Sequence, residues 1–198
     1  MKQVGNYQKM LEEIIKENTE RPTLALHSCC APCSSYVLEY LMEHFEITLF
    51  FSNSNIYPQS EYSHRLDEQL RLCGILGIKA VECSYNPEAF YENVKGFEGE
   101  PEGGARCTKC FEMRLELTAC EAEKEGITFL GTTLTVSPHK NAPLINEIGK
   151  TAALRHNLLW LPSDFKKKDG YLKSIQLSHK YNLYRQNYCG CKFSMNRG

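Results

Sequence analysis

The stretch Leu24-Ala25-Leu26-His27-Ser28-Cys29-Cys30-Ala31-Pro32-Cys33 decides how this chain is expected to fold. Its apolar first half is typical of a buried strand, and Pro32 suits the first turn of a following helix. Three cysteines lie where the predicted strand passes into the predicted helix. The stretch therefore predicts both a strand-to-helix unit and a thiol-rich site at the carboxyl end of the strand.

Four more predicted strands follow, alternating with helices. The strands are expected at 47–53, 78–83, 127–133 and 158–161, and helices at 6–19, after Pro32, and at 60–76, 87–95, 107–126, 142–156 and 169–182. Such alternation predicts right-handed crossovers and a mostly parallel five-stranded sheet in a single α/β domain over residues 1–198. In sheets of this kind ligands bind beyond the carboxyl ends of the strands, where the strand order reverses.

A second cysteine pair is expected at the same edge. Cys107 and Cys110 are three residues apart at a predicted helix start, so their sulfurs can converge on one metal. Helix N-termini also favour thiolates. Cys29 and Cys30 should point opposite ways in an extended chain, which favours an iron–sulfur cluster with separate corners over a single small ion. A structural zinc on four cysteines remains the alternative, and the role of Cys33 stays open.

A third cysteine pair, Cys189-Gly190-Cys191, comes near the end of the chain. A disulfide across so short a loop would be strained and easily reduced, which suits a redox-active pair. A metal-ligand role and a pair of free thiols are the alternatives.

Composition places the chain among ordinary globular proteins. It has 198 residues, of which 42% are hydrophobic and 24% charged. No apolar run approaches the roughly 18 residues of a membrane span, and the first residues lack the pattern of a secretory signal. We therefore expect a cytoplasmic protein without membrane contact, in which the clustered cysteines bind metal or perform redox chemistry, whereas Cys73, Cys83 and Cys120 stand alone and act as small buried hydrophobic residues.

Charge is distributed unevenly along the sequence. Residues 166–198 carry a net charge of +7, and the rest of the chain carries −8. This predicted basic, aromatic C-terminal helix and tail is expected to pack at the active-site edge and to face an anionic partner such as single-stranded nucleic acid. A solvated basic surface is the alternative. Candidate substrate-binding residues are Tyr57, Arg106, His139, Lys140, Lys166, Lys167, Arg185 and Tyr188, and Asp164 is a candidate extra metal ligand or proton donor.

The three cysteine motifs together resemble one family. Cys-Cys-Ala-Pro-Cys after the first strand, Arg-Cys-x-x-Cys at a helix start and Tyr-Cys-Gly-Cys near the end are similar to those of QueH, the epoxyqueuosine reductases that work without cobalamin. The resemblance spans His27 to Ser194. It implies a three-layer Rossmann-like fold of the HUP, adenine-nucleotide α-hydrolase type, with cysteines where ATP-using relatives carry a phosphate loop.

The resemblance also implies a function: reduction of epoxyqueuosine to queuosine at the wobble position of tRNA, the last step of queuosine synthesis. It implies a 4Fe-4S cluster on Cys29, Cys30, Cys107 and Cys110, a redox-active disulfide pair at Cys189 and Cys191, and an electron donor yet to be identified. A further iron ion beside the cluster is compatible with it. The alternatives are an ATP-dependent tRNA-modifying transferase and a zinc-bearing RNA-binding module.

Overall fold

The computed structural model describes residues 6–195 as an alternation of helices and strands. The elements run in the order α1 (Tyr7–Glu17), β1 (Thr23–His27), α2 (Ala31–Leu41), β2 (Glu46–Phe51), α3 (Gln59–Leu76), β3 (Lys79–Glu82), α4 (Pro87–Asn93), α5 (Ala105–Lys124), β4 (Phe129–Thr132), η1 (Thr133–Val136), α6 (Ala142–Arg155), β5 (Leu159–Trp160), α7 (Gly170–Lys180) and η2 (Lys192–Ser194). None of these helices is long and apolar enough to cross a membrane.

The five strands form one sheet in the order β3-β2-β1-β4-β5. Every neighbouring pair is parallel, so the predicted parallel sheet is confirmed and is parallel throughout. β1 lies at the centre, with Leu26 opposite Leu49 of β2 on one side and Gly131 of β4 on the other. The strand order reverses between β1 and β4, so the cysteines after β1 lie at the switch point, where a ligand site is expected.

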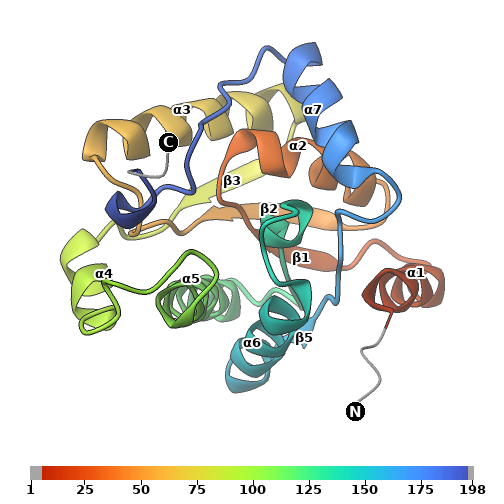
Figure 1. Ribbon diagram of the computed structural model, residues 1–198. Coiled ribbons are helices and arrows are strands. Elements are labelled where there is room, and N and C mark those ends of the chain that lie inside the picture. Colours follow the sequence, from red (N-terminus) through yellow and green to blue (C-terminus); the bar gives the residue numbers. More distant parts are fainter. Residues whose placement is uncertain (1–5, 196–198) are drawn as a thin grey trace.

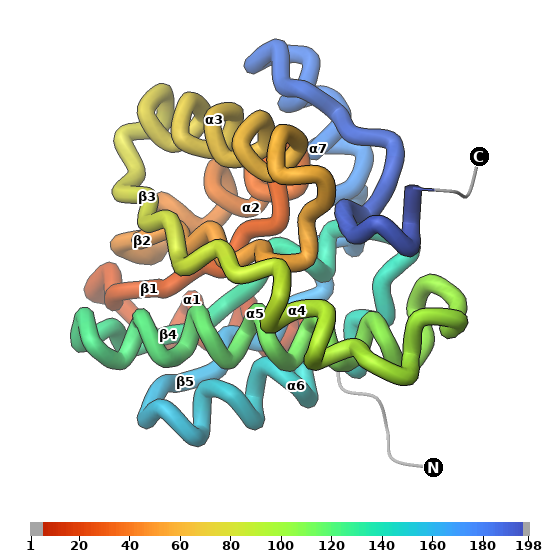
Figure 2. Tube along the Cα trace, turned by 90° about the vertical axis from the view of Figure 1, so that its left-hand side faces the viewer, coloured from red at the N-terminus to blue at the C-terminus, as the bar shows by residue number. Residues whose placement is uncertain are grey.

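Helices cover both faces of the sheet and make three layers (Figure 1, Figure 2). α2, α3 and α7 lie on one face, and α5 and α6 lie on the other. Successive side chains of β1 alternate between the two, as expected for a buried strand. Leu24 and Leu26 join the core beneath α2 and α3, whereas Ala25 joins the core beneath α5 and α6.

Helix boundaries follow from local capping chemistry. The side chains of Asn6, Asn86 and Asn141 accept hydrogen bonds from backbone N–H groups in the first turns of α1, α4 and α6. Gly77 ends α3 in the left-handed conformation, at φ 67°. The helices therefore begin and end within a few residues of their predicted limits, whereas β5 has only two residues.

The segment after α7 returns along α3 to the carboxyl edge of the sheet (Figure 1). Arg71 of α3 donates hydrogen bonds to the carbonyls of Tyr181 and Asn182, and Glu68 accepts one from the backbone N–H of Tyr184. α3 thus binds the main chain of the tail and directs it toward the cysteines. The last three residues of the predicted tail, 196–198, lie outside the described residues.

Candidate metal centre and redox cavity

Three cysteines converge immediately after β1. The sulfurs of Cys29, Cys30 and Cys33 all lie within 4.8 Å of one another, and Cys29 and Cys30 are 3.8 Å apart. The expectation that the adjacent pair would point opposite ways is therefore wrong, because the chain leaves the strand and bends at Cys29. Cys33, whose role the sequence left open, stands with the other two sulfurs. Within residues 6–195 this is the one group of three or more Cys, His, Asp or Glu side chains that could hold a metal ion.

Buried amide side chains hold this cysteine loop in place. Gln69 of α3 accepts hydrogen bonds from the hydroxyls of Ser28 and Ser34, at 2.7 Å and 2.9 Å. Asn53, which follows β2, donates to the Ser28 carbonyl at 2.8 Å. The loop is therefore tied to α3, to α2 and to the end of the neighbouring strand.

A buried cation lies behind the thiols. Arg114 of α5 donates to the Asn53 side chain at 2.6 Å, and its Nη1 lies 4.0 Å from the sulfur of Cys110. Burial disfavours its charge, but the neighbouring sulfurs of Cys110 and Cys29 outweigh that and raise the pKa of Arg114. A buried charge needs a partner of opposite sign, and Cys29 can provide it, because the pKa of its thiol is lowered.

The thiols of Cys29, Cys30 and Cys33 differ in pKa. Hydrogen bonds from Cys30 and then from Cys33 hold the pKa of Cys29 well below its usual range. The same hydrogen bonds raise the pKa of Cys30 to about 11 and also raise that of Cys33. Cys29 is thus the first of the three to become a thiolate, the form that binds metal.

Cys107 and Cys110 lie at the start of α5, as predicted, and each packs in a different cluster: Cys107 against the cluster that contains Cys29 and Cys30, and Cys110 beside Cys191 of the tail. The sulfur of Cys107 accepts a hydrogen bond from the Gly103 N–H at 3.2 Å. Cys110 and Cys191 are buried in one apolar cluster that also contains Phe90. Burial raises the pKa of Cys110 to about 12. All ten cysteines are free thiols.

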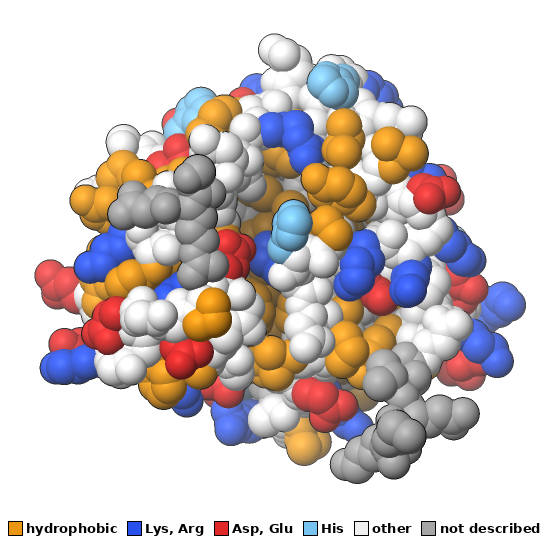
Figure 3. Space-filling view, in the orientation of Figure 1, with side chains coloured by type: hydrophobic (Ala, Val, Ile, Leu, Met, Phe, Trp, Pro, Cys, Tyr) orange, Lys and Arg blue, Asp and Glu red, His pale blue; other side chains and the backbone are white. Residues whose placement is uncertain are grey.

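One cavity connects the first cysteine group to the tail. It has a volume of about 570 Å³, and Cys29, Cys33 and Cys189 are among its lining residues. Figure 3 shows hydrophobic side chains gathered around a hollow at the centre of this face, with Lys and Arg side chains around it. A smaller recess joins Cys189 to Cys107. Cys189 is thus the thiol that faces both groups.

Four of the predicted substrate-binding residues line this cavity: His139, Lys140, Arg185 and Tyr188. Burial opposes the charge on Lys140, but thiolates at Cys189 and Cys29 raise its pKa, so it remains a cation beside the thiols. These four come from the loop after β4 and from the tail, which are far apart in sequence.

The other candidates are not among the residues that line the cavity. Arg106 is buried and donates to the carbonyls of Glu98 and Glu100, where it shapes the loop before α5. The backbone N–H of Tyr57 donates to the Gly190 carbonyl. Asp164 pairs with Lys166 at 2.7 Å, and Asp164 and Lys167 line a different cavity beside α1.

Two residues that contact the site could not be predicted from the sequence. Gln186 in the tail donates to the Cys30 sulfur at 2.9 Å, and Arg65 of α3 donates to the carbonyls of Tyr188 and Cys189. Neither residue belongs to a motif or a recognisable spacing. Their roles depend on the tail lying against α3, which no local pattern reveals.

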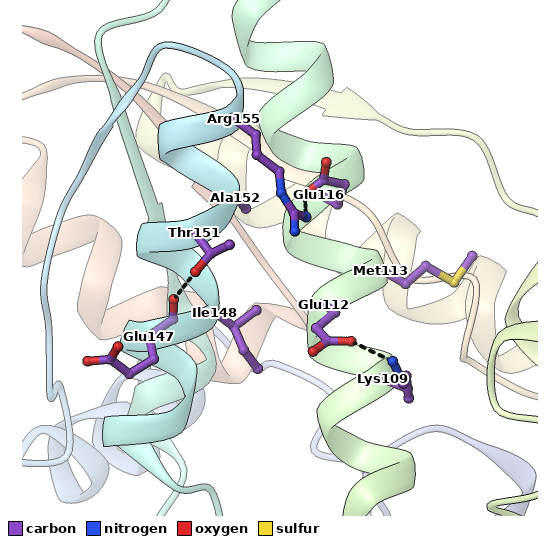
Figure 4. A pocket seen from close by; sticks show the side chains of 9 residues that line it. All are labelled: Lys109, Glu112, Met113, Glu116, Glu147, Ile148, Thr151, Ala152 and Arg155. Carbon is purple, nitrogen blue, oxygen red and sulfur yellow. Dashed lines mark hydrogen bonds and ion pairs between the residues drawn. The ribbon is translucent and has the colours of Figure 1, made fainter.

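A second groove, of about 510 Å³, lies between α5 and α6 (Figure 4). Four of its charged side chains form two ion pairs: Lys109 with Glu112 and Arg155 with Glu116, both at 3.3 Å. None of the cysteines lines it. The candidate functional cysteines Cys29, Cys33 and Cys189 line the cavity described above and not this groove.

Comparison with known proteins finds one family over most of the chain. The family model for epoxyqueuosine reductase QueH matches residues 24–197. The protein of that name from Staphylococcus epidermidis is 46% identical over 200 residues, covering 96% of this chain and 84% of that protein. Those from Streptococcus pyogenes and Thermotoga maritima are 39% and 36% identical; they cover 96% and 87% of this chain, and the matches span 78% and 90% of those proteins.

Proposed function

This chain belongs to the epoxyqueuosine reductase QueH family, and we propose that it reduces epoxyqueuosine to queuosine at the wobble position of tRNA. The reaction removes the epoxide oxygen and leaves a cyclopentene. The observation that carries the proposal is the single cavity in which Cys29, Cys33 and Cys189 meet. It brings a metal-binding group of thiols and a thiol of the tail pair to the same space.

The donor set fits a thiolate-bound iron centre. Soft sulfur ligands select iron–sulfur clusters and zinc over magnesium or calcium, and Arg114 and Lys140 supply positive charge beside a thiolate-rich anion. We propose that Cys29, Cys30, Cys107 and Cys110 hold a 4Fe-4S cluster. We further propose that Cys33, whose sulfur lies within 4.8 Å of those of the first pair, would ligate an additional iron ion. When bound, such a centre supplies a Lewis acid for the epoxide oxygen and a store for electrons.

The tail pair supplies the reducing equivalents. Removing the epoxide oxygen as water requires two electrons and two protons. Oxidation of the Cys189 and Cys191 thiols to one disulfide releases two electrons and two protons, so the reaction balances. An external dithiol or an electron-donor protein must then reduce that disulfide before the next turnover.

The nucleotide is held by groups at the cavity mouth. Tyr188 presents an aromatic ring, and Arg185 and His139 present polar edges, in the combination that binds unstacked bases and phosphates of a single-stranded loop. We propose that the anticodon loop of tRNA enters here. Because tRNA is modified in the cytoplasm, we propose that location for the protein.

The function is tested on protein purified without oxygen. We expect a brown preparation with iron and sulfide near cluster stoichiometry, and mass analysis of tRNA nucleosides should show conversion of epoxyqueuosine to queuosine. Cys107→Ala should lose both iron and conversion, whereas Cys120→Ala, on the same helix but in none of the cysteine groups, should lose neither.

Other outcomes would count against the proposal. Full iron and full conversion by Cys107→Ala would exclude the assigned cluster. ATP hydrolysis or an adenylate formed with tRNA would indicate the transferase instead. A colourless protein with one zinc and no redox signal would indicate an RNA-binding module.

A further inference from the structure

Arg65, a buried arginine of α3, binds the backbone of the tail loop that carries Cys189 and Cys191. Arg65 donates from Nη1 to the Cys189 carbonyl at 3.1 Å and from Nη2 to the Tyr188 carbonyl at 3.3 Å. Its Nε donates to Glu61 at 2.7 Å, and its side chain is only 1% exposed. A charged donor that is buried and fully engaged makes a strong and directional anchor. The anchor acts on the peptide units immediately before Gly190.

Gly190 allows the loop to approach this anchor. It adopts φ +135°, a conformation that residues with side chains rarely adopt. A Cβ at this position would lie 3.2 Å from Nη1 of Arg65 and 3.2 Å from Ile56. The Gly190 carbonyl accepts a hydrogen bond from the Tyr57 N–H at 2.8 Å. The loop is thus held from both sides through its main chain rather than through its cysteine side chains.

Within this loop, the two cysteine side chains lie in different surroundings. Cys189 lines the cavity shared with Cys29 and Cys33. Cys191 is only 8% exposed and lies in the apolar cluster with Cys110, where its sulfur is 3.6 Å from the Ser194 hydroxyl. One thiol of the pair is therefore accessible from the cavity, and the other is shielded.

We propose that Arg65 is a positioning residue that keeps Cys189 in the cavity as the thiol that exchanges with the donor, and Cys191 buried as the thiol that leaves when the disulfide breaks. This inference rests on the proposed redox role of the pair. After turnover, the thiolate of an external dithiol attacks the Cys189 sulfur, the disulfide breaks, and Cys191 leaves as a thiolate that takes up a proton. The second thiol of the donor then displaces Cys189, so the donor becomes a disulfide and both cysteines are reduced.

The experiment measures how fast each thiol reacts. The anaerobic enzyme is treated with iodoacetamide, and the alkylation rates of Cys189 and Cys191 are read by peptide mass spectrometry. The variants are Arg65→Gln, Arg65→Lys and Gly190→Ala. Arg71→Gln is the matched control, because Arg71 lies on the same helix and also binds tail carbonyls, but those of Tyr181 and Asn182. Thermal unfolding of each variant separates a local change from loss of the fold.

In the wild type we expect Cys189 to react faster than Cys191. Arg65→Gln and Gly190→Ala should reduce the ratio of the two rates by about tenfold or more, as expected for loss of a hydrogen bond to a charged group. Arg65→Lys should retain part of the ratio and Arg71→Gln all of it. In multiple turnover, Arg65→Gln should lower kcat with KM for tRNA unchanged.

Two results would overturn the inference: a wild-type Cys191 that reacts as fast as Cys189, or a ratio in folded Arg65→Gln and Gly190→Ala equal to that of wild type. The alkylation is measured without tRNA. Failure of the proposed function would instead appear as wild-type enzyme that does not convert epoxyqueuosine.

Discussion

At the scale of single residues, the contact between Gln186 and Cys30 links the tail to the group of three cysteines that could hold a metal. Nε2 of Gln186 lies 2.9 Å from the Cys30 sulfur, and the two residues are 156 positions apart in sequence. Hydrogen bonds to ligand sulfurs stabilise the more negative, reduced state of an iron–sulfur centre and so raise its reduction potential. Gln186 therefore connects the position of the tail to the electronic properties of the proposed cluster.

Replacing Gln186 by leucine should lower the reduction potential of that cluster while leaving its iron content unchanged. One hydrogen bond contributes about 1 kcal/mol, which corresponds to a fall of about 40 mV for a one-electron couple. Redox titration followed by electron paramagnetic resonance measures the shift. Gln176→Leu, at an exposed position of α7, is the control and should leave the potential unchanged. An unchanged potential in Gln186→Leu would show that the contact does not act on the cluster.

The residues that sequence could and could not predict differ in how their contacts arise. Cys29, Cys30, Cys107 and Cys110 were predicted from short spacings and from the rule that ligands bind at the carboxyl ends of strands. The convergence of the Cys29, Cys30 and Cys33 sulfurs was not predicted, because it depends on the bend of the chain at Cys29. Gln186 and Arg65 contact the site only because distant segments pack together. Periodicity and motifs carry no information on such pairings.

At the scale of elements, sequence was a better guide. The alternation of apolar strands and amphipathic helices predicted each strand and each α-helix of the described residues, with limits displaced by a few residues. The shortest strand is β5, which pairs with β4 through only Leu159 and Trp160. Trp160 packs across Gly149 of α6, so that helix holds this edge of the sheet.

His156, at the end of α6, is expected to make the stability of the contact between α6 and α5 depend on pH. Its Nδ1 lies 2.8 Å from Glu123 and its Nε2 lies 3.1 Å from Glu116, both on α5. The hydrogen bond with Glu123, and then that with Glu116, raises the pKa of His156 despite partial burial. A group whose pKa is raised on folding stabilises the fold fully below its unfolded pKa of about 6.5, and this stabilisation is lost as pH rises through the folded pKa.

We therefore expect His156→Gln to lower the free energy of unfolding at pH 6 and to change it little at pH 9. Both glutamates are partly exposed, so the difference at pH 6 should be no more than about 1 kcal/mol. Urea unfolding under reducing conditions at the two pH values measures it, with His179→Gln, at an exposed position of α7, as the control. An equal loss at both pH values would mean that His156 acts by packing rather than by charge.

At the scale of the whole molecule, folding redistributes the charge asymmetry of the sequence. The C-terminal segment from residue 166 carries +7, but several of its lysines pair with acidic residues of the fold: Lys166 with Asp164, Lys168 with Glu12 and Lys180 with Glu39. Arg185, by contrast, lines the cavity together with Lys140. The positive field that an RNA loop meets at the cavity therefore comes from fewer cations than the sequence suggests.

This distribution predicts which cations bind tRNA. Arg185→Ala should weaken tRNA binding several-fold and reduce the salt dependence, by about 0.7 in the slope of log K against log salt for each single-strand phosphate that the variant no longer neutralises. Lys167→Ala removes the same charge from an exposed position beside a different cavity and should change both quantities less. Binding of epoxyqueuosine tRNA to each variant over a range of salt concentrations measures the two effects. Equal reductions in the two variants would mean that tRNA is attracted by the whole basic segment, including the lysine run predicted from sequence, rather than by the mouth of the cysteine cavity.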